Sequence, residues 1–207
     1  MSKVLLINGS PHINGCTATA LDIVAEDLQR GNVDTETVHI GNKDIRGCIA
    51  CRKCKETGRC VFNDIVNELA PKFEHADGLV VGSPVYFAGP NGTLTNLLDR
   101  LFFSASYSLR MKVGAAVVSA RRAGTTAALD RLNKYFQLAE MPVVSSRYWN
   151  MVHGNSAEEV MQDEEGIQIM RVLGRNMAFL VRAIAAERER GGLPEVDPMH
   201  INTNFIR

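Results

Sequence analysis

The sequence has no excess of either charge and no long apolar run, and both absences exclude whole classes of protein. Its 23 Lys and Arg residues balance its 23 Asp and Glu residues, which argues against binding to nucleic acid or to an anionic membrane surface. No apolar run approaches the ~20 residues that a membrane-spanning helix needs. Met1-Ser2-Lys3 leads directly into a short apolar run without the apolar core of a signal peptide, so we expect a cytoplasmic protein.

Cysteine is also scarce, with five in 207 residues, yet four of the five lie between positions 48 and 60. In a reducing compartment a disulfide framework is disfavoured. An even scatter would be typical of buried core thiols, whereas this cluster indicates metal or redox chemistry.

Strand-like runs and helical stripes alternate along the first 150 residues. Apolar or alternating runs predict strands at 4–7, 35–40, 78–81 and 113–118, and the start of a fifth at 142. Between them, apolar residues at helical spacing predict helices over 16–29, 65–73, 94–102 and 124–138. This alternation predicts an α/β protein with a parallel sheet and helices on both faces.

A long helix is predicted near the end of the chain, before Gly191, Gly192 and Pro194. Since one helix cannot form a domain, we expect a single domain over 1–207, with a core in 1–150 and a helix and tail in 151–207. The apolar stripe of the helix either covers the sheet or packs on a partner subunit, and our hypothesis assigns it to a subunit contact. The stripe consists of Met170, Leu173, Met177, Leu180 and Ile184.

Three of the predicted strands end in loops rich in Gly, Ser, Thr and Pro, and ligands of open parallel sheets bind at such strand ends. The first loop runs from Gly9 to Thr17, and a helix start of this kind points backbone N–H groups at an anion. It has no Lys or Arg and matches neither G-x-x-x-x-G-K-[ST] nor G-x-G-x-x-G, which disfavours a P-loop NTPase and the usual dinucleotide fingerprint. It fits a phosphate monoester held by neutral donors; a capped turn without a ligand is the alternative.

The pattern G-S-P-x-x-N-G-x-T in this loop resembles the FMN-phosphate loop of the flavodoxin-like NAD(P)H-dependent FMN reductases. Loops at 82–87 and 118–125 resemble the second and third flavin loops of that family, and Leu98-Asp99-Arg100 resembles part of its following helix. The spacing Cys-x2-Cys-x2-Cys-x5-Cys is similar to the iron–sulfur flavoprotein branch. Covering residues 3–150, the resemblance implies a flavodoxin-like, doubly wound, five-stranded parallel sheet of order 2-1-3-4-5 with a long C-terminal helix.

The resemblance further implies that FMN is bound by the three loops and that no side chain needs to be catalytic, because the flavin carries the chemistry. We expect Tyr86 or Phe87 to contact the flavin or a subunit interface. Arg121 lies where a cation would offset charge on reduced flavin or grip an NAD(P)H phosphate. His12 and Cys16 depart from the Arg and Asn common in the family. The implied flavin contacts are Ser10, His12, Asn14, Cys16, Thr17, Pro84, Val85, Tyr86, Phe87, Ser119, Ala120, Arg121 and Gly124.

The four clustered cysteines are the implied metal ligands of a [4Fe-4S] cluster. Three cysteines at this spacing are similar to the run that binds a cluster in bacterial ferredoxins, whereas zinc usually takes two Cys-x2-Cys pairs ~15–20 residues apart. Reduced thiols, zinc and disulfides stay as alternatives. The predicted ligands are Cys48, Cys51, Cys54 and Cys60.

These features predict an FMN-dependent oxidoreductase that takes hydride from NADH or NADPH and passes electrons to a flavin, a quinone, a small electrophile or a protein. One alternative is an electron carrier with FMN and a cluster but no direct reaction with NAD(P)H. Another is a flavin-binding redox sensor that uses the cysteine loop as a switch. The resemblance implies a homodimer or homotetramer with the flavin near a subunit boundary.

Overall fold

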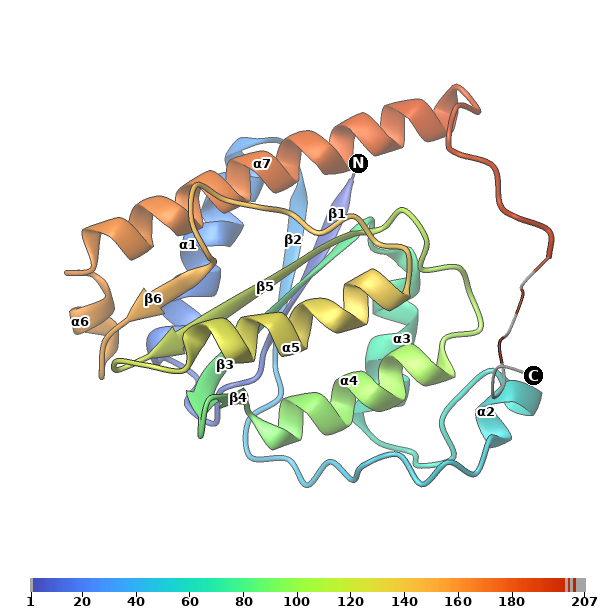
Figure 1. Ribbon diagram of the computed structural model, residues 1–207, viewed down its shortest axis with the longest axis horizontal. Coiled ribbons are helices and arrows are strands. Elements are labelled where there is room, and N and C mark those ends of the chain that lie inside the picture. Colours follow the sequence, from blue (N-terminus) through green and yellow to red (C-terminus); the bar gives the residue numbers. More distant parts are fainter. Residues whose placement is uncertain (1, 200, 202, 204–207) are drawn as a thin grey trace.

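The computed structural model describes residues 2–199, 201 and 203 of the chain (Figure 1). Its strands are β1 (Lys3–Asn8), β2 (Asp34–His39), β3 (Gly78–Tyr86), β4 (Gly89–Pro90), β5 (Val113–Ala120) and β6 (Met151–His153). Its helices are α1 (Cys16–Arg30), α2 (Lys53–Thr57), α3 (Ile65–His75), α4 (Gly92–Ser104), α5 (Thr125–Leu138), α6 (Ala157–Val160) and α7 (Glu164–Glu189). The predicted tail after Pro194 lies only partly within the described residues.

The sheet confirms the predicted flavodoxin-like order. Its strands run β2-β1-β3-β5-β6, all parallel, and the short β4 pairs antiparallel with the end of β3. The chain changes direction across the sheet between β1 and β3, so the crevice where ligands bind in such folds lies beyond the carboxyl ends of these two strands.

Helices cover both faces of the sheet and enclose two hydrophobic clusters. On one face, α3, α4 and α5 pack against residues such as Leu5, Val81 and Val118. On the other face, α1 and α7 pack against residues such as Leu6, Val80 and Val117. Alternate residues of one strand thus enter opposite cores, which is why β1, β3 and β5 read as nearly continuous apolar runs. Within the described part of the chain, no helix is long and apolar enough to cross a membrane.

The fifth strand lies later in the chain than predicted. Around the predicted start at 142, Val143 makes only an isolated bridge to Gly114, and the strand proper is β6, paired with Val118–Ala120. Pro142 has no N–H group, so this pairing cannot extend toward the residues before it, and after Val144 the chain leaves the sheet edge before it returns at Met151. The elements β4, α2 and α6 were also not predicted, because each spans at most five residues.

The apolar stripe of α7 covers the sheet, and its assignment to a subunit contact is wrong. Met170, Leu173 and Met177 are fully buried within the chain, and Leu180 and Ile184 pack against the margin of the same cluster. The stripe lies against α1, so closely that a Cβ atom on Gly174 would stand 2.8 Å from the carbonyl oxygen of Val24. Met170, Leu173 and Met177 are therefore unavailable to a partner.

We predict that Leu173→Ala lowers the free energy of unfolding by about 2–5 kcal/mol, because it removes a buried side chain and leaves a cavity. Phe179→Ala on the exposed face of the same helix is the control, and we expect a change within about 0.5 kcal/mol. Urea denaturation at two protein concentrations checks both. A loss for Leu173→Ala that grows on dilution would place the stripe in a subunit contact instead.

Candidate functional site

A cavity of about 880 Å³ opens beyond the carboxyl ends of β1, β3 and β5. All the predicted flavin-contact residues line it except Phe87 and Gly124. Pro11, Ile13 and Gly15 of the first loop also line it, as does a segment after β6 that the sequence analysis missed. The predicted residues that the fold brings together here are Ser10, His12, Asn14, Cys16, Thr17, Pro84, Val85, Tyr86, Ser119, Ala120 and Arg121.

The amino terminus of α1 supplies the anion-binding feature of the cavity. Its N-cap, Gly15, has no side chain to occupy the first-turn N–H groups, and the first turn holds no acidic residue. The loop before it is kept open by its own polar groups, since Ser10 Oγ accepts from the His12 N–H at 3.1 Å. Uncapped amides and the helix dipole together favour a phosphate at this end of the cavity.

Buried polar contacts join the three loops. Thr17 Oγ1 and Ser119 Oγ lie 2.8 Å apart and connect the first loop to the third. The Asn91 side chain donates to the Gly9 carbonyl at 2.8 Å, and the Asn91 backbone N–H donates to Ser83 Oγ at 2.9 Å. The two bonds connect the first loop to the second. A Cβ atom on Gly9 would stand 2.8 Å from the Gly82 carbonyl oxygen, so only glycine allows these backbones to approach. The cavity is therefore preformed.

A tight hairpin forms the wall contributed by β3 and β4. Phe87 and Ala88 occupy its tip with φ of 50° and 59°, the left-handed pair that joins twisted strands in a two-residue turn. This geometry turns Phe87 fully into solvent, while Tyr86 stays half-exposed on the cavity. Gly124 packs behind the hairpin, where a Cβ atom would stand 2.8 Å from Ala88 Cα. Phe87 and Gly124 thus do not line the cavity in this structure, and their contact with the flavin stays a prediction.

The unpredicted wall is the segment Gly154 to Glu158, which follows β6. The Cys16 thiol donates to the Gly154 carbonyl at 3.4 Å and ties α1 to this wall. Burial and the neighbouring Glu159 and Glu158 raise the pKa of Cys16, so it stays a neutral thiol at pH 7. Gly154-Asn155-Ser156 is made of small and polar residues like the other strand-end loops. Because the fifth strand was predicted to start at 142, this segment was not recognised as the loop at its end.

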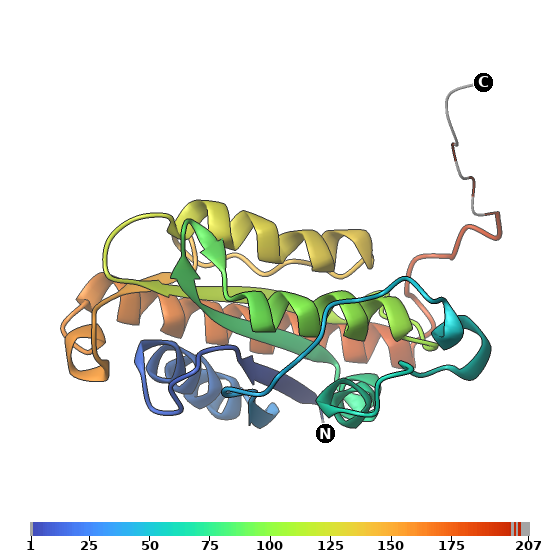
Figure 2. The same cartoon turned by 90° about the horizontal axis from the view of Figure 1, so that it is seen from below.

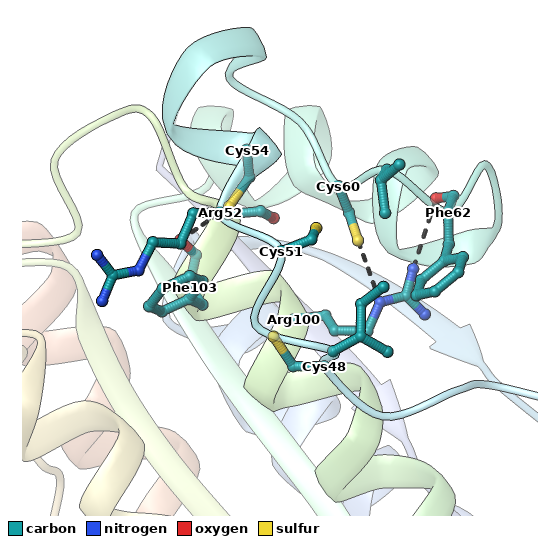
Figure 3. A pocket seen from close by; sticks show the side chains of 11 residues that line it. Cys48, Cys51, Arg52, Cys54, Cys60, Phe62, Arg100 and Phe103 are labelled. Carbon is teal, nitrogen blue, oxygen red and sulfur yellow. Dashed lines mark hydrogen bonds between the residues drawn. The ribbon is translucent and has the colours of Figure 1, made fainter.

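The four clustered cysteines surround a second, smaller cavity (Figure 3), which is lined by Cys48, Cys51, Cys54 and Cys60 together with Arg100 and Phe103. All five cysteines of the chain are free thiols. In the described part of the chain, no three His, Cys, Asp or Glu side chains are close enough to coordinate one ion. One tetrahedral zinc ion needs sulfurs about 3.8 Å apart, whereas in an iron–sulfur cluster thiolates bind several iron atoms. The cavity is about 20 Å³ in volume, and the four thiols on its rim are the donor type that an iron–sulfur cluster takes.

Arg100, which the sequence analysis did not select, lies beneath this cavity on α4. Its side chain is 1% exposed and forms a bidentate ion pair with Asp64, the N-cap of α3, at 2.7 and 2.8 Å. Burial lowers its pKa, but hydrogen bonds to Asp64 and Cys60 outweigh that effect and raise it, so the guanidinium is charged. A usable signal was present: Arg100 follows Leu97 by one helical turn and so falls on the apolar side of the stripe.

Helix α4 separates the two cavities. Its N-cap, Asn91, contacts the loops of the large cavity, and Phe103 near its other end lines the cysteine cavity. Figure 2 shows the β3–β4 hairpin at one end of α4 and the cysteine loop with α2 at the other. The axis from Gly92 to Ser104 is about 18 Å long, at 1.5 Å per residue.

Comparisons with known proteins identify the family of the chain. The sequence profile of the NADPH-dependent FMN reductase family matches residues 2–156. An iron–sulfur flavoprotein of Methanocaldococcus jannaschii is 33% identical over 194 residues, which cover 88% of this chain and 98% of the relative.

Solved structures share the fold at lower identity. RosB, solved with an 8-demethyl-8-formylriboflavin-5′-phosphate intermediate, superposes with a TM-score of 0.72 at 14% identity, covering 100% of this chain and 94% of RosB. A flavodoxin from the domain Archaea superposes with a TM-score of 0.59 at 16% identity, covering 87% of this chain and 99% of the flavodoxin. These likenesses show the flavodoxin-like fold.

We predict that Thr17→Val raises the dissociation constant of FMN about tenfold, because it removes a hydroxyl at the first turn of α1 and its bond to Ser119. Thr19→Val is the matched control, since Thr19 bonds only the Gly15 carbonyl and does not line the cavity. Titration of free FMN, followed by its fluorescence, measures both constants. Equal affinities in the two variants would contradict the placement of the phosphate.

Proposed function

Because the chain belongs to the NADPH-dependent FMN reductase family, in its iron–sulfur flavoprotein branch, we propose that it is an FMN-dependent oxidoreductase that reacts with NADH or NADPH. The observation that carries this proposal is the uncapped amino terminus of α1, which faces a preformed cavity at the carboxyl edge of the sheet. When bound, FMN supplies the redox chemistry: it takes a hydride, which is two electrons and a proton, and releases the electrons in a pair or singly.

The residues of the cavity bind and orient FMN. The first-turn amides of α1 hold its phosphate without a cationic side chain in the first loop. Pro84, Val85 and Tyr86 offer apolar surface and backbone polar groups to the ring, and Pro84 fixes the backbone direction. The hydrogen bond between the Thr17 and Ser119 hydroxyls holds the third loop beside the first.

The nicotinamide substrate enters from the solvent side of the same cavity. Arg121 lines the cavity at this open side, while Arg122 does not line it. A guanidinium matches a phosphate group in a bidentate manner, which suits the phosphates of NADH or NADPH. We therefore assign Arg121 to nicotinamide binding.

The cysteine loop holds an iron–sulfur cluster in this proposal. Four thiols line one cavity, and Arg52 and Arg100 line it as well. Nearby cations stabilise thiolates, which are the form that binds metal. With such a cluster the protein would accept two electrons from one donor and pass them one at a time to a small-molecule or protein acceptor.

An electron carrier without direct NAD(P)H reaction is the second candidate function. It is favoured by the cysteine cavity, because a reductase of flavin alone does not need a second site with four thiols. It is also favoured by the relative from Methanocaldococcus jannaschii, which is an iron–sulfur flavoprotein. This candidate predicts normal FMN binding together with negligible reduction by either nicotinamide.

A homodimer or homotetramer completes the proposal. Because the two cavities lie toward opposite ends of α4 in one chain, a second copy that brings its cysteine loop to the flavin cavity would shorten the electron path. Exposed aromatic residues at the rim, Tyr86 and Phe87, are available for that contact. We expect light scattering to give a mass of at least twice 22.7 kDa, and a monomer at all concentrations would contradict the assembly.

We predict that anaerobic mixing with NADPH or NADH bleaches the flavin absorption, and that Arg121→Gln raises the apparent dissociation constant of the nicotinamide about tenfold. The limiting rate should change little, since Arg121 binds a remote phosphate in both ground and transition states. Arg122→Gln is the matched control and should behave as the wild type. Stopped-flow absorption measures both quantities, and no bleaching by either nicotinamide would leave the carrier as the function.

A further inference from the structure

We propose that Arg100 is the positioning residue of Cys60. Its Nε–H group donates to Cys60 Sγ, holds this sulfur at the cavity as the preformed member of the four ligands, and makes a cluster bound there easier to reduce. The positioning half stands on the structure alone, and the electrochemical half rests on the proposed cluster.

The contact between the two side chains is direct and sheltered. Arg100 Nε lies 3.2 Å from Cys60 Sγ, within hydrogen-bond distance for sulfur, and Figure 3 shows the sulfur directed at the guanidinium. Arg100 is 1% exposed, so neither water nor salt screens the interaction effectively. The donor comes from a helix packed in the core, which gives it a fixed position.

The remaining donors of Arg100 leave it no freedom to turn. Its two terminal nitrogens grip Asp64, and Nη1 also donates to the Arg46 carbonyl at 3.2 Å. Its guanidinium lies over the Phe62 ring, 5.0 Å from the centroid. These contacts come from the segments before and after the cysteine loop, so Arg100 joins both ends of that loop to α4.

Cys60 is also fixed through its backbone, which sets it apart from the other three cysteines. The Asn67 side chain accepts from the Cys60 N–H and donates to the Cys60 carbonyl, both at 2.9 Å. Cys48 and Cys51 are exposed, and Cys54 Sγ makes only a 3.9 Å contact with the Phe103 carbonyl. Cys60 is therefore anchored at its N–H, its carbonyl and its sulfur, while the other three cysteines are held less firmly.

The hydrogen bond from Arg100 to the Cys60 sulfur explains the electrochemical half. If a cluster is bound, one electron from the reduced flavin would add one negative charge to it and break no bond. A charged donor to a ligand sulfur stabilises this more negative form more than the oxidised form, and hydrogen bonds to sulfur are among the factors that set cluster potentials. Arg100 thereby raises the reduction potential.

The positioning half is tested without a cluster, by a double-mutant cycle in reduced, metal-free protein. We expect Cys60→Ala to change the unfolding equilibrium constant about fivefold less in the Arg100→Lys background than in the wild type, because lysine lacks the Nε donor. The matched cycle of Arg100→Lys with Cys54→Ala should show no coupling. Additive effects in the first cycle, or equal coupling in both, would overturn the positioning role.

The electrochemical half is tested on the anaerobically loaded protein by a redox titration followed by electron paramagnetic resonance. Arg100→Lys should lower the equilibrium constant for cluster reduction about tenfold, a shift of about −59 mV for one electron, and leave the FMN potential unchanged. Asp64→Asn removes a negative charge but keeps the donor to Cys60, so it should not lower the potential. An unchanged midpoint for Arg100→Lys, or equal shifts in both variants, would overturn this half.

The two tests separate this inference from the function on which it partly rests. Wild-type protein that binds no iron when prepared without oxygen would overturn the cluster and the electrochemical half together. The double-mutant cycle would still decide whether Arg100 holds Cys60, because it needs only the folded chain.

Discussion

Helix α4 holds two sites apart, and this separation constrains what the protein can do with electrons. A buried polar residue fixes each site to the helix: Asn91 at its N-cap ties the first and second loops, and Arg100 near its other end ties the cysteine loop. Both side chains are buried and bonded, so neither site can shift without a large loss of stability. The distance between the flavin cavity and the cysteine cavity is therefore a property of the fold, and a second copy offers a way to shorten the path.

The neutral composition of the chain is consistent with the site. A phosphate does not require a cationic loop where uncapped amides of α1 and its dipole meet the anion. Positive charge is instead gathered around the cysteine loop, with Arg52 exposed and Arg100 buried at the same cavity. The two sites thus hold negative groups by different means, with backbone dipoles at one and guanidinium groups at the other.

Periodicity was enough to predict the parallel sheet and the long helices, because apolar runs are local signals. The order of the strands and the residues of the cavity wall were instead implied by the resemblance to the FMN reductases, which rests on the Gly-rich strand ends. The differences between the predicted and the observed structure have physical causes. The wall at Gly154 was missed because the chain leaves the sheet edge after Val144 and forms the strand proper only at β6. Phe87 turns outward because a two-residue hairpin imposes a positive φ, and the roles of Arg100 and its partner Asp64 depend on a contact between distant segments that no spacing reveals.

The most direct test of two redox groups in one chain is a measurement of bound FMN, iron and acid-labile sulfide, with an absorption spectrum, on protein purified without oxygen. We expect one FMN per chain with about four iron and about four sulfide, and flavin bands on a broad iron–sulfur absorption. Flavin bands without iron or sulfide would contradict the cluster and leave the cysteine loop as free thiols. Protein that cannot bind FMN under any condition would contradict the function as a whole.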